Sequence, residues 1–336
     1  MDSLTHFAIG ACIGQAFAGK KIGKKAMLMG AAAQSLPDID FIASFWLDPA
    51  HNVLAHRGFT HSILFTLLAV PLLAWLGEKL ERKNILSYRG WIYFFAIQLF
   101  THLFLDAFNA YGVGWFEPFD HTRVSFHILF VADPLFSIFP AIAFLGLLFA
   151  GRNSKKIKTW VKFGLFPVAI YLCWGIYNKA IVETDVKKIA KRQNIKYQRH
   201  FTTPTPFNNI VWFVVLEVDS GYQIAHRSAY TNSSQIKFYY FPRNEFLLDS
   251  IAYRPDVILL QRFSQGFYTI DKWKDTLVFS DLRFGQVVGW YNPAGRFAFH
   301  YYLNPGMDNL LVIPRGRFEG WDVNAIRSLI KKMFGD

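Results

Sequence analysis

Long uncharged apolar segments in the first half of the chain restrict what it can fold into. Four segments contain no Asp, Glu, Lys or Arg, namely residues 62–77, 91–105, 134–150 and 163–177. With their flanking residues, each reaches the roughly 20 residues that a membrane-spanning helix needs. Two further segments, 4–19 and 26–47, are rich in glycine and alanine, and Gly10 and Gly14 have the small-xxx-small spacing that lets helix backbones approach closely. The sequence therefore predicts about six membrane helices.

The composition supports a membrane protein and excludes several other classes. Of 336 residues, 52% are hydrophobic and only 18% are charged, whereas soluble domains carry about a quarter charged residues. This composition excludes intrinsic disorder and a coiled coil, and a count of two cysteines excludes a disulfide scaffold. The alternative is the buried helical core of a soluble protein, which the lengths of the apolar segments disfavour. The N-terminal segment is expected to be retained, because its lysines follow the apolar stretch, whereas a signal peptide carries them in front.

The loops between the six predicted helices alternate in positive charge. Residues 20–25 and 78–90 hold four Lys or Arg each and residues 151–162 hold five, whereas 38–61 and 109–127 hold one each. The positive-inside rule places the three basic loops in the cytoplasm and the other loops outside. Six crossings then put both termini and the C-terminal domain on the outer face. Because these loops use much of the formal net charge of +12, we expect no direct nucleic-acid binding.

Beyond residue 180 the pattern changes to short alternating segments separated by turn residues, which is typical of β-strands. The expected strands lie within residues 210–218, 222–230, 235–241, 257–269, 285–291 and 296–303. Residues 321–333 predict a final amphipathic helix. We therefore predict an α-helical membrane domain over residues 1–178, a basic, Pro- and Thr-containing linker over 179–206, and a mainly antiparallel, β-rich soluble domain over 207–336.

Histidines and acidic residues of the first half collect at one end of the predicted helices. Seven of the ten histidines lie within the first 127 residues. With six crossings, each of these polar groups falls at the outer end of its segment. Scattered structural residues would not segregate in this way, and charged groups within spans are costly and usually functional. The candidate site residues are His6, Asp38, Asp40, His56, Arg57, His61, His102, Asp106, His127 and Asp133.

This combination of residue types points to metal binding. Neutral imidazole with carboxylate oxygen suits Zn, Mn or Fe(II), and the lack of cysteine ligands argues against a structural zinc site. His102 and Asp106 are four residues apart, so both project from one helical face. All candidates except Arg57 are expected ligands, and their number exceeds the need of one tetrahedral ion, which predicts two or three metal ions. Taken singly, each could instead be an interfacial hydrogen-bonding residue or a helix cap.

Four motifs together resemble a known family. They are M-D-S-L-T-H at the N-terminus, L-P-D-I-D, H-R-G-F-T-H-S, and the H-x3-D pair of His102 and Asp106. In combination they resemble a bacterial inner-membrane family of metal-dependent hydrolases, also known as a LexA-binding, membrane-associated family. The stretches that begin at Pro204 and Asp281 are similar to the outer domain of longer members.

The family is also distantly similar to zinc-dependent phospholipase C, a helical enzyme that holds three zinc ions. The order of ligands in that enzyme matches, in this sequence, His6, Asp38 or Asp40, His56 or His61, and His102 with Asp106. Its later His and acidic ligands have no clear counterpart, and His127 and Asp133 are the candidates for them.

The resemblance implies a hydrolase of the bacterial inner membrane, and we expect it to act on phosphoester bonds, with a lipid headgroup as one substrate class. Metal-activated water would attack phosphorus, Asp38 or Asp40 would act as general base, and Arg57 would bind a phosphate or carboxylate oxygen. The alternatives are a non-enzymatic metal-binding or transport protein and a protein whose β-rich domain binds a partner of unknown kind.

Overall fold

The chain divides into two compact units. The computed structural model describes residues 2–81, 85–151, 154–231, 236–250, 255–303 and 320–334. Unit 1 comprises Met1–Trp46, Ala55–Phe126 and Val131–Trp174. Unit 2 comprises Leu47–Leu54, His127–Phe130 and Gly175–Asp336.

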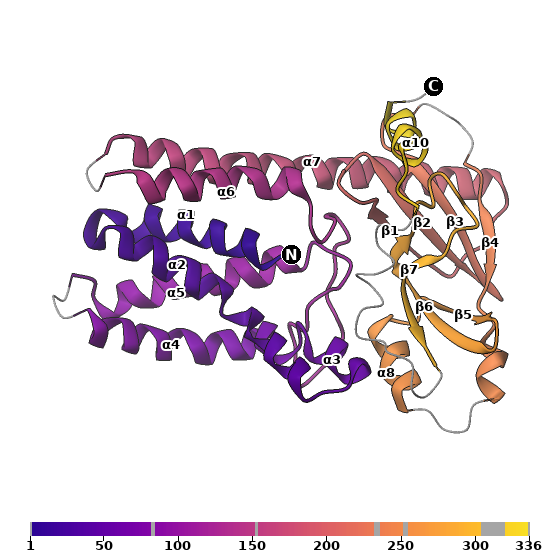
Figure 1. The fold of residues 1–336 in the computed structure, drawn as a ribbon, viewed down its shortest axis with the longest axis horizontal. Helices are drawn as coiled ribbons and strands as arrows, with labels where there is room; N and C mark the ends of the chain where they lie inside the picture. The colour runs from indigo at the N-terminus through magenta and orange to yellow at the C-terminus, as the bar shows by residue number, and fades with distance from the viewer. Residues whose placement is uncertain are drawn as a thin grey trace. The chain divides into compact units, whose positions relative to one another are not determined.

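Helices dominate the first 192 residues (Figure 1). They are α1 (Ser3–Ile22), α2 (Lys24–Ser35), α3 (Pro49–Ala55), α4 (Ile63–Leu80), α5 (Tyr88–Asp106), α6 (Pro134–Phe149) and α7 (Lys156–Arg192), with the 3-10 helices η1 (Pro37–Phe45) and η2 (Phe59–His61). Within unit 1, α1 packs against α2, α5 and α6, and α4 packs against α5. The apolar segments of the sequence therefore form a bundle of neighbouring helices.

Side-chain caps fix where several of these helices begin. Asp2 accepts a hydrogen bond from the backbone N–H of Thr5 at the start of α1. Ser62 and Ser87 play the same part at the starts of α4 and α5. Such caps satisfy backbone donors that a helix leaves unpaired at its N-terminus. Because Ser62 caps the N-terminus of α4, the preceding residue His61 is held beside the start of that helix.

The backbones of α1 and α2 are in direct contact through small residues. Gly10 and Gly14 of α1 face Gly30 and Ala26 of α2, and an added Cβ at Gly30 would overlap the carbonyl oxygen of Gly10. The side chain of Gln98 in α5 donates to the same carbonyl at 3.2 Å. The small-xxx-small spacing thus marks a close helix contact, as glycine permits.

Two of the described helices, α4 and α7, are long and apolar enough to cross a membrane, so the prediction of about six spans is not supported. The other helices fall short in length or in apolar character. With 12 residues, α2 is about 18 Å long, well under a hydrocarbon core of about 30 Å, and α6 has 16 residues. Polar residues reduce the apolar character of α1 and α5. Two spans do not support the multi-pass topology or the outer-face placement of the C-terminal domain, because both predictions counted six crossings.

The outward side chains of the helical unit are nevertheless strongly apolar. Leu72 of α4, Phe100 of α5, Ile142 of α6 and Phe166 of α7 are all exposed. Large apolar side chains exposed on several helices of one unit favour a membrane or protein contact over open solvent.

Unit 2 is built on two antiparallel sheets, which confirms the predicted β-rich class of the second half. The first has the order β1-β2-β3-β4 and the second the order β5-β6-β7. Their strands are β1 (Arg199–Pro204), β2 (Val211–Val218), β3 (Gly221–Ser228), β4 (Tyr239–Pro242), β5 (Tyr268–Trp273), β6 (Thr276–Gln286) and β7 (Phe297–Tyr302). In register, Phe213 pairs with His226, and Ser280 pairs with His300. Phe201, Phe213, Tyr222 and Leu282 contribute to one buried core drawn from both sheets.

Two local expectations in this half differ from the structure, and a third lies partly outside the described residues. The predicted linker is the end of α7 followed by β1, because Val182, Val186 and Ile189 bury an apolar stripe against β2 and β3. The strand expected over 257–269 is mostly helix α8 (Pro255–Phe263), and the short 3-10 helix η3 (Glu245–Ser250) precedes it. Gln235, the first residue of the strand expected over 235–241, lies outside the described residues.

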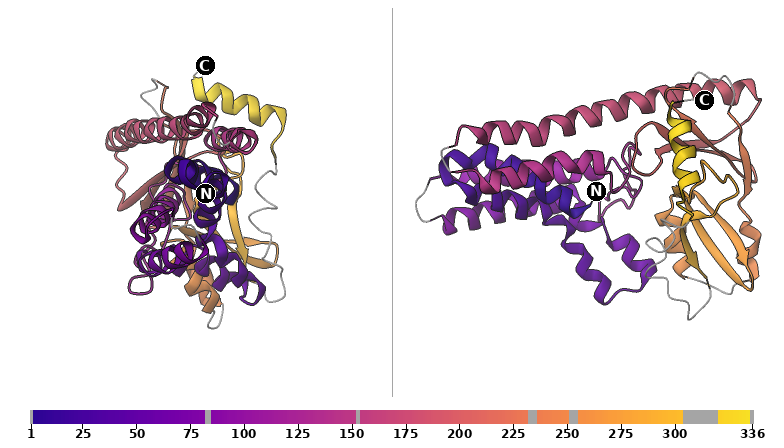
Figure 2. Two further views of the ribbon diagram at one scale, coloured as in Figure 1. Left: turned by 90° about the vertical axis from the view of Figure 1, so that its left-hand side faces the viewer. Right: turned by 45° about the horizontal axis from the view of Figure 1, so that its top comes forward.

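The final amphipathic helix is present as α10 (Val323–Phe334), which packs on β2 and β3 (Figure 2). Ala325 and Leu329 are its buried residues, and they contact Val211, Val288 and Trp290. The side chain of Trp290 also donates to the backbone carbonyl of Ala325 at 3.0 Å. This helix therefore forms one wall of the β unit.

Candidate metal centre

Four titratable side chains from separate elements of unit 1 converge in its interior. Asp38 lies in η1, His61 ends η2, and His102 and Asp106 lie one turn apart at the end of α5. The start of α1 reaches the same end of the bundle (Figure 1). His61, His102 and Asp106 are completely buried, and Asp38 is 9% exposed. We call Asp38, His61, His102 and Asp106 the ligand cluster.

The spacing within the ligand cluster suits a single ion. One ligand atom from each residue lies within 4.8 Å of the other three. The two histidine Nε2 atoms are 3.0 Å apart. Asp106 Oδ2 lies 3.3 Å from Nε2 of His61 and 3.6 Å from Nε2 of His102, and Asp38 Oδ1 lies 3.6 and 3.7 Å from the same two atoms. Ligands of a tetrahedral ion with bonds of about 2.1 Å are about 3.4 Å apart, close to these separations.

The hydrogen bonds of the two histidines leave their inner nitrogens as acceptors. His102 Nδ1 lies 2.6 Å from the carbonyl oxygen of Gln34, which can only accept, so Nδ1 carries the proton. His61 Nδ1 lies 3.2 Å from a carboxylate oxygen of Asp40 and donates in the same way. In neutral rings both Nε2 atoms then hold lone pairs, and two lone pairs 3.0 Å apart repel. A cation between them removes this repulsion, and outer partners of this kind are typical of metal-binding histidines.

The buried side-chain charges around the ligand cluster also favour added positive charge. Asp38, Asp40 and Asp106 contribute three negative charges, and Arg57 contributes one positive charge 3.2 Å from Asp106, which leaves −2 when the imidazoles are neutral. One divalent ion would neutralise that charge, whereas uncompensated buried charge is strongly destabilising. Burial alone would lower the pKa of His61, but hydrogen bonds with the three carboxylates raise it to about 9. The site therefore favours a positive charge at His61, supplied by a proton or by a metal ion.

Asp40 and His56 lie behind the ligand cluster. Asp40 Oδ2 accepts from the backbone N–H of Arg57 at 2.7 Å and from the Thr60 hydroxyl at 3.2 Å, in addition to His61. Asp40 Oδ1 pairs with His56 Nδ1 at 3.0 Å. Both carboxylate oxygens of Asp40 are thus engaged in holding the loop and orienting His61. Asp40 and His56, both predicted as ligands, lie outside the group of four and pair with each other beside it.

Arg57 is buried and oriented by two neighbours. Its backbone has a left-handed φ of 58°, and its side chain donates to Asn109 Oδ1 at 2.8 Å and lies over the Tyr111 ring at 5.1 Å. The sequence reasoning did not single out Asn109, which is completely buried. Its position three residues after Asp106, just beyond the end of α5, is the signal that could have identified it. The Gln34 carbonyl carries no such signal, because any residue supplies a backbone carbonyl.

His6 lies against the ligand cluster. Its Nε2 is 3.0 Å from Asp106 Oδ1, and its ring centroid is 3.9 Å from that of His102. Its buried Nδ1 makes no hydrogen bond within the described part of the chain. A carboxylate held by a histidine on one oxygen offers its other oxygen in a fixed direction. His6 therefore orients Asp106. The early histidine that the sequence predicts lies beside the ligand cluster, where it can support a ligand.

His127 and Asp133 have other partners in the described structure and are not members of the ligand cluster. The ring of His127 stacks on Phe201 with centroids 5.3 Å apart. Asp133 caps α6 by accepting from the backbone N–H of Leu135 at 3.0 Å, and it accepts from the Tyr171 hydroxyl at 2.6 Å. These contacts place both residues outside the ligand cluster, and the buried Nδ1 of His127 makes no hydrogen bond with the described residues.

We expect Asp40→Asn to weaken divalent metal binding about 10- to 100-fold, the usual cost of removing a carboxylate that orients a metal-binding histidine. An amide nitrogen cannot accept the hydrogen bond from His61. Competition with a chromogenic chelator, using detergent-purified protein, measures the affinity. Asp48→Asn is the matched control, because Asp48 also pairs with a histidine, His51 at 2.6 Å, but on the exposed surface. Equal metal affinities in the two variants would contradict the orienting role.

The chain is similar to bacterial inner membrane proteins. Inner membrane protein YbcI of Escherichia coli (strain K12) is 34% identical over 123 residues, which is 36% of this chain and 69% of that protein. YfhP of Bacillus subtilis (strain 168), whose name describes it as uncharacterized, is 29% identical over 182 residues, which is 51% of this chain and about half, 53%, of that protein. No solved structure matches the chain significantly.

A family model described as YdjM inner membrane protein matches residues 1–182. This match confirms the inner-membrane part of the resemblance drawn from the sequence, but it has no bearing on metal-dependent hydrolysis or LexA binding. Because it covers more than half of the 336 residues and all four members of the ligand cluster, the chain belongs to the YdjM family of inner membrane proteins.

Proposed function

We propose that this inner membrane protein is a metal-dependent hydrolase of phosphoester bonds, with lipid headgroups among its substrates. The observation that carries the proposal is the pair of histidine Nε2 atoms 3.0 Å apart, enclosed by two carboxylates in a buried site with excess negative charge. A helix-stabilising pair or a helix cap would not need this arrangement.

The donor set favours a transition metal. Two imidazoles and two carboxylates suit Zn²⁺, Mn²⁺ or Fe²⁺, and zinc enzymes commonly combine histidine with an acidic ligand. We propose zinc, with at least one ion held by Asp38, His61, His102 and Asp106. If a second ion binds, His6 is the ligand that we propose for it, because its ring lies beside Asp106.

A bound divalent ion supplies Lewis acidity toward a phosphoryl oxygen and lowers the pKa of water. Asp38 is the general base that we favour, because its buried Oδ2 accepts no hydrogen bond from the described residues, whereas both oxygens of Asp40 are engaged. Arg57 provides a fixed positive charge beside Asp106, which reduces the repulsion of an anionic substrate. Asn109 keeps the guanidinium in that orientation.

The test is phosphodiester hydrolysis by the full chain in detergent, loaded with Zn²⁺ or Mn²⁺. Bis(p-nitrophenyl) phosphate is the soluble probe, and phosphatidylglycerol vesicles are the lipid probe. We expect metal-dependent product release, and a loss of kcat of about 100-fold or more in Asp38→Asn, as for removal of a general base. Because Asp38 is also a proposed ligand, the variant is assayed at saturating Zn²⁺ with its metal content measured. Asp48→Asn, an exposed Asp at the start of α3, is expected to keep the wild-type rate.

One result would refute the hydrolase and leave the metal site standing. If metal-loaded wild-type protein hydrolyses neither probe faster than metal-free protein, the chain is a metal-binding protein without this activity. If Asp38→Asn keeps the wild-type rate, the base is another residue and the assignment of Asp38 is wrong.

A further inference from the structure

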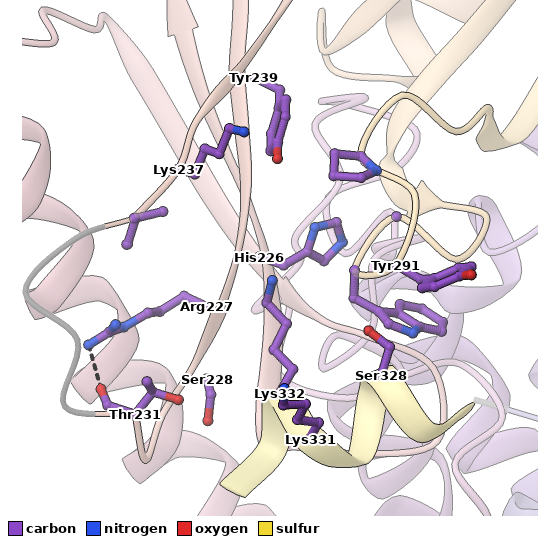
Figure 3. A pocket seen from close by; sticks show the side chains of 14 residues that line it. His226, Arg227, Ser228, Thr231, Lys237, Tyr239, Tyr291, Ser328, Lys331 and Lys332 are labelled. Carbon is purple, nitrogen blue, oxygen red and sulfur yellow. Dashed lines mark hydrogen bonds between the residues drawn. The ribbon is translucent and has the colours of Figure 1, made fainter. Parts of the chain in front are cut away.

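Unit 2 contains a pocket that the proposed hydrolase chemistry does not use. Its volume is about 530 Å³, within the range of small-molecule sites. Its walls come from β3, from the chain just before β4, from the turn after β6 and from α10 (Figure 3).

The side chains around this pocket are strongly cationic. Arg227, Lys237, Lys331 and Lys332 line it, and no described lining residue is acidic. Arg227 is paired with Asp185, whose carboxylate lies 2.7 Å away, and Lys237 and Lys332 bring further positive charge to the pocket wall. Like charges gathered around a concave surface raise the local concentration of anions.

Lys332 is the most informative of these cations. Its side chain extends from α10 toward His226 of β3 (Figure 3). Burial lowers the pKa of Lys332. Burial also lowers the pKa of His226 to about 3, with a smaller contribution from the charge of Lys332. His226 is therefore neutral at physiological pH and leaves the positive charge of Lys332 without an acidic partner in the described pocket wall.

The other lining groups suit a ligand that is only partly polar. Tyr239, Tyr291 and Ser328 contribute hydroxyl groups, and Trp290 contributes an aromatic face. The indole of Trp290 is fixed by its hydrogen bond to α10. Hydroxyl and ammonium donors suit phosphate oxygens, and a rigid aromatic surface suits an organic group.

We propose that this pocket, between β3, the turn after β6 and α10, binds a phosphate monoester that carries an organic group. A phosphate monoester has a charge near −2 at neutral pH, which matches a pocket lined by Lys237 and Lys332 better than a single carboxylate does. The ligand is either a soluble phosphate ester or the headgroup of a phosphomonoester lipid, since both present the same chemical group.

Isothermal titration of the full chain in detergent tests this proposal. The probe is phenylphosphonate, a dianion with an aromatic ring that a phosphoesterase cannot hydrolyse. We expect saturable binding in wild type and at least tenfold weaker binding in Lys332→Met. Arg327→Met is the matched control, because Arg327 is an exposed cation of α10 that does not line the pocket, and its change should be under twofold.

The source of the ligand is distinguished by competition. Nanodiscs that contain phosphatidic acid will displace phenylphosphonate if the pocket takes a lipid headgroup, and glycerol 3-phosphate alone will displace it if the ligand is soluble. The proposal is overturned if wild type binds no probe, or if Arg327→Met and Lys332→Met weaken binding equally, since that would be general electrostatic attraction. Titrations in EDTA and with Asp106→Asn should still show binding, which separates this site from the metal centre.

Discussion

Replacing His102 and Asp106 together by alanine should lower the bound divalent metal from at least one equivalent per chain to below about a tenth. The double variant removes two of the four ligands that lie within 4.8 Å of one another. The two that remain, Asp38 and His61, cannot complete a coordination shell, and metal affinity falls steeply with each lost ligand. Elemental analysis after reconstitution with Zn²⁺ and removal of free ion gives the measurement.

The same chemical change at the surface gives the control. Glu117 and His121 also form an acid–histidine pair four residues apart, at 2.7 Å, and the His121 side chain is 54% exposed. Glu117→Ala with His121→Ala should leave the metal content unchanged. Because His102 and Asp106 are buried, His102→Gln with Asp106→Asn serves as a second variant that preserves side-chain volume, and circular dichroism confirms its helix content. Wild-type metal content in this folded variant would rule out the ligand cluster as the binding site.

The sequence allowed us to predict that the polar site residues come together. Apolar helices that pack side by side place their polar ends at the same end of the bundle. His6 near the start of α1, His61 just before α4 and the His102–Asp106 pair at the end of α5 meet for this reason. A four-residue spacing on a helix fixes a shared face, so His102 and Asp106 could be paired without any structure.

The division between ligands and supporting residues could not be predicted. Position at a helix end says nothing about rotation of the side chain, so Asp38 and Asp40 look alike in the sequence. In the structure, Asp38 contributes an oxygen to the ligand cluster. Asp40 instead accepts hydrogen bonds from the Arg57 backbone, the Thr60 hydroxyl and the His61 ring. The nitrogen of His102 that carries the proton is set by the backbone carbonyl of Gln34 in α2. Every residue type has such a carbonyl, so the sequence does not reveal it.

The number of spans and the linker were misjudged for a common reason. Apolar composition predicts burial but does not identify what covers the surface. Short α2 buries its apolar face against α1 and α5. The basic stretch after residue 178 continues α7. Val182, Val186 and Ile189 recur at helical spacing between its lysines and form the face that packs against the sheet. Helical spacing of apolar residues was therefore a better guide there than charge.

The contact between α1 and α2 links helix packing to the metal centre. Gly30 of α2 touches the backbone of Gly10, and Gln34, one turn further along α2, supplies the carbonyl that orients His102. An added Cβ at Gly30 would meet the Gln98 amide, which can rotate away, and main-chain atoms of Gly10 and Gly14, which cannot move without shifting α1. A displacement of α2 would carry the Gln34 carbonyl with it.

Gly30→Ala is therefore expected to destabilise the protein by about 1–3 kcal/mol, the usual cost of overpacking a close-packed contact, and to weaken Zn²⁺ binding at the same time. Gly90→Ala is the matched change in α5, where the nearest atom to an added Cβ is 3.4 Å away and belongs to a leucine side chain. Alanine is favoured over glycine in a helix by roughly 0.5–1 kcal/mol, so this variant should be as stable as wild type or more so, with unchanged metal affinity. Chemical unfolding in detergent and chelator competition measure the two quantities. If Gly30→Ala lost stability but kept wild-type metal affinity, α2 would not transmit packing to His102, and the Gln34 carbonyl would not be the group that fixes the ligand.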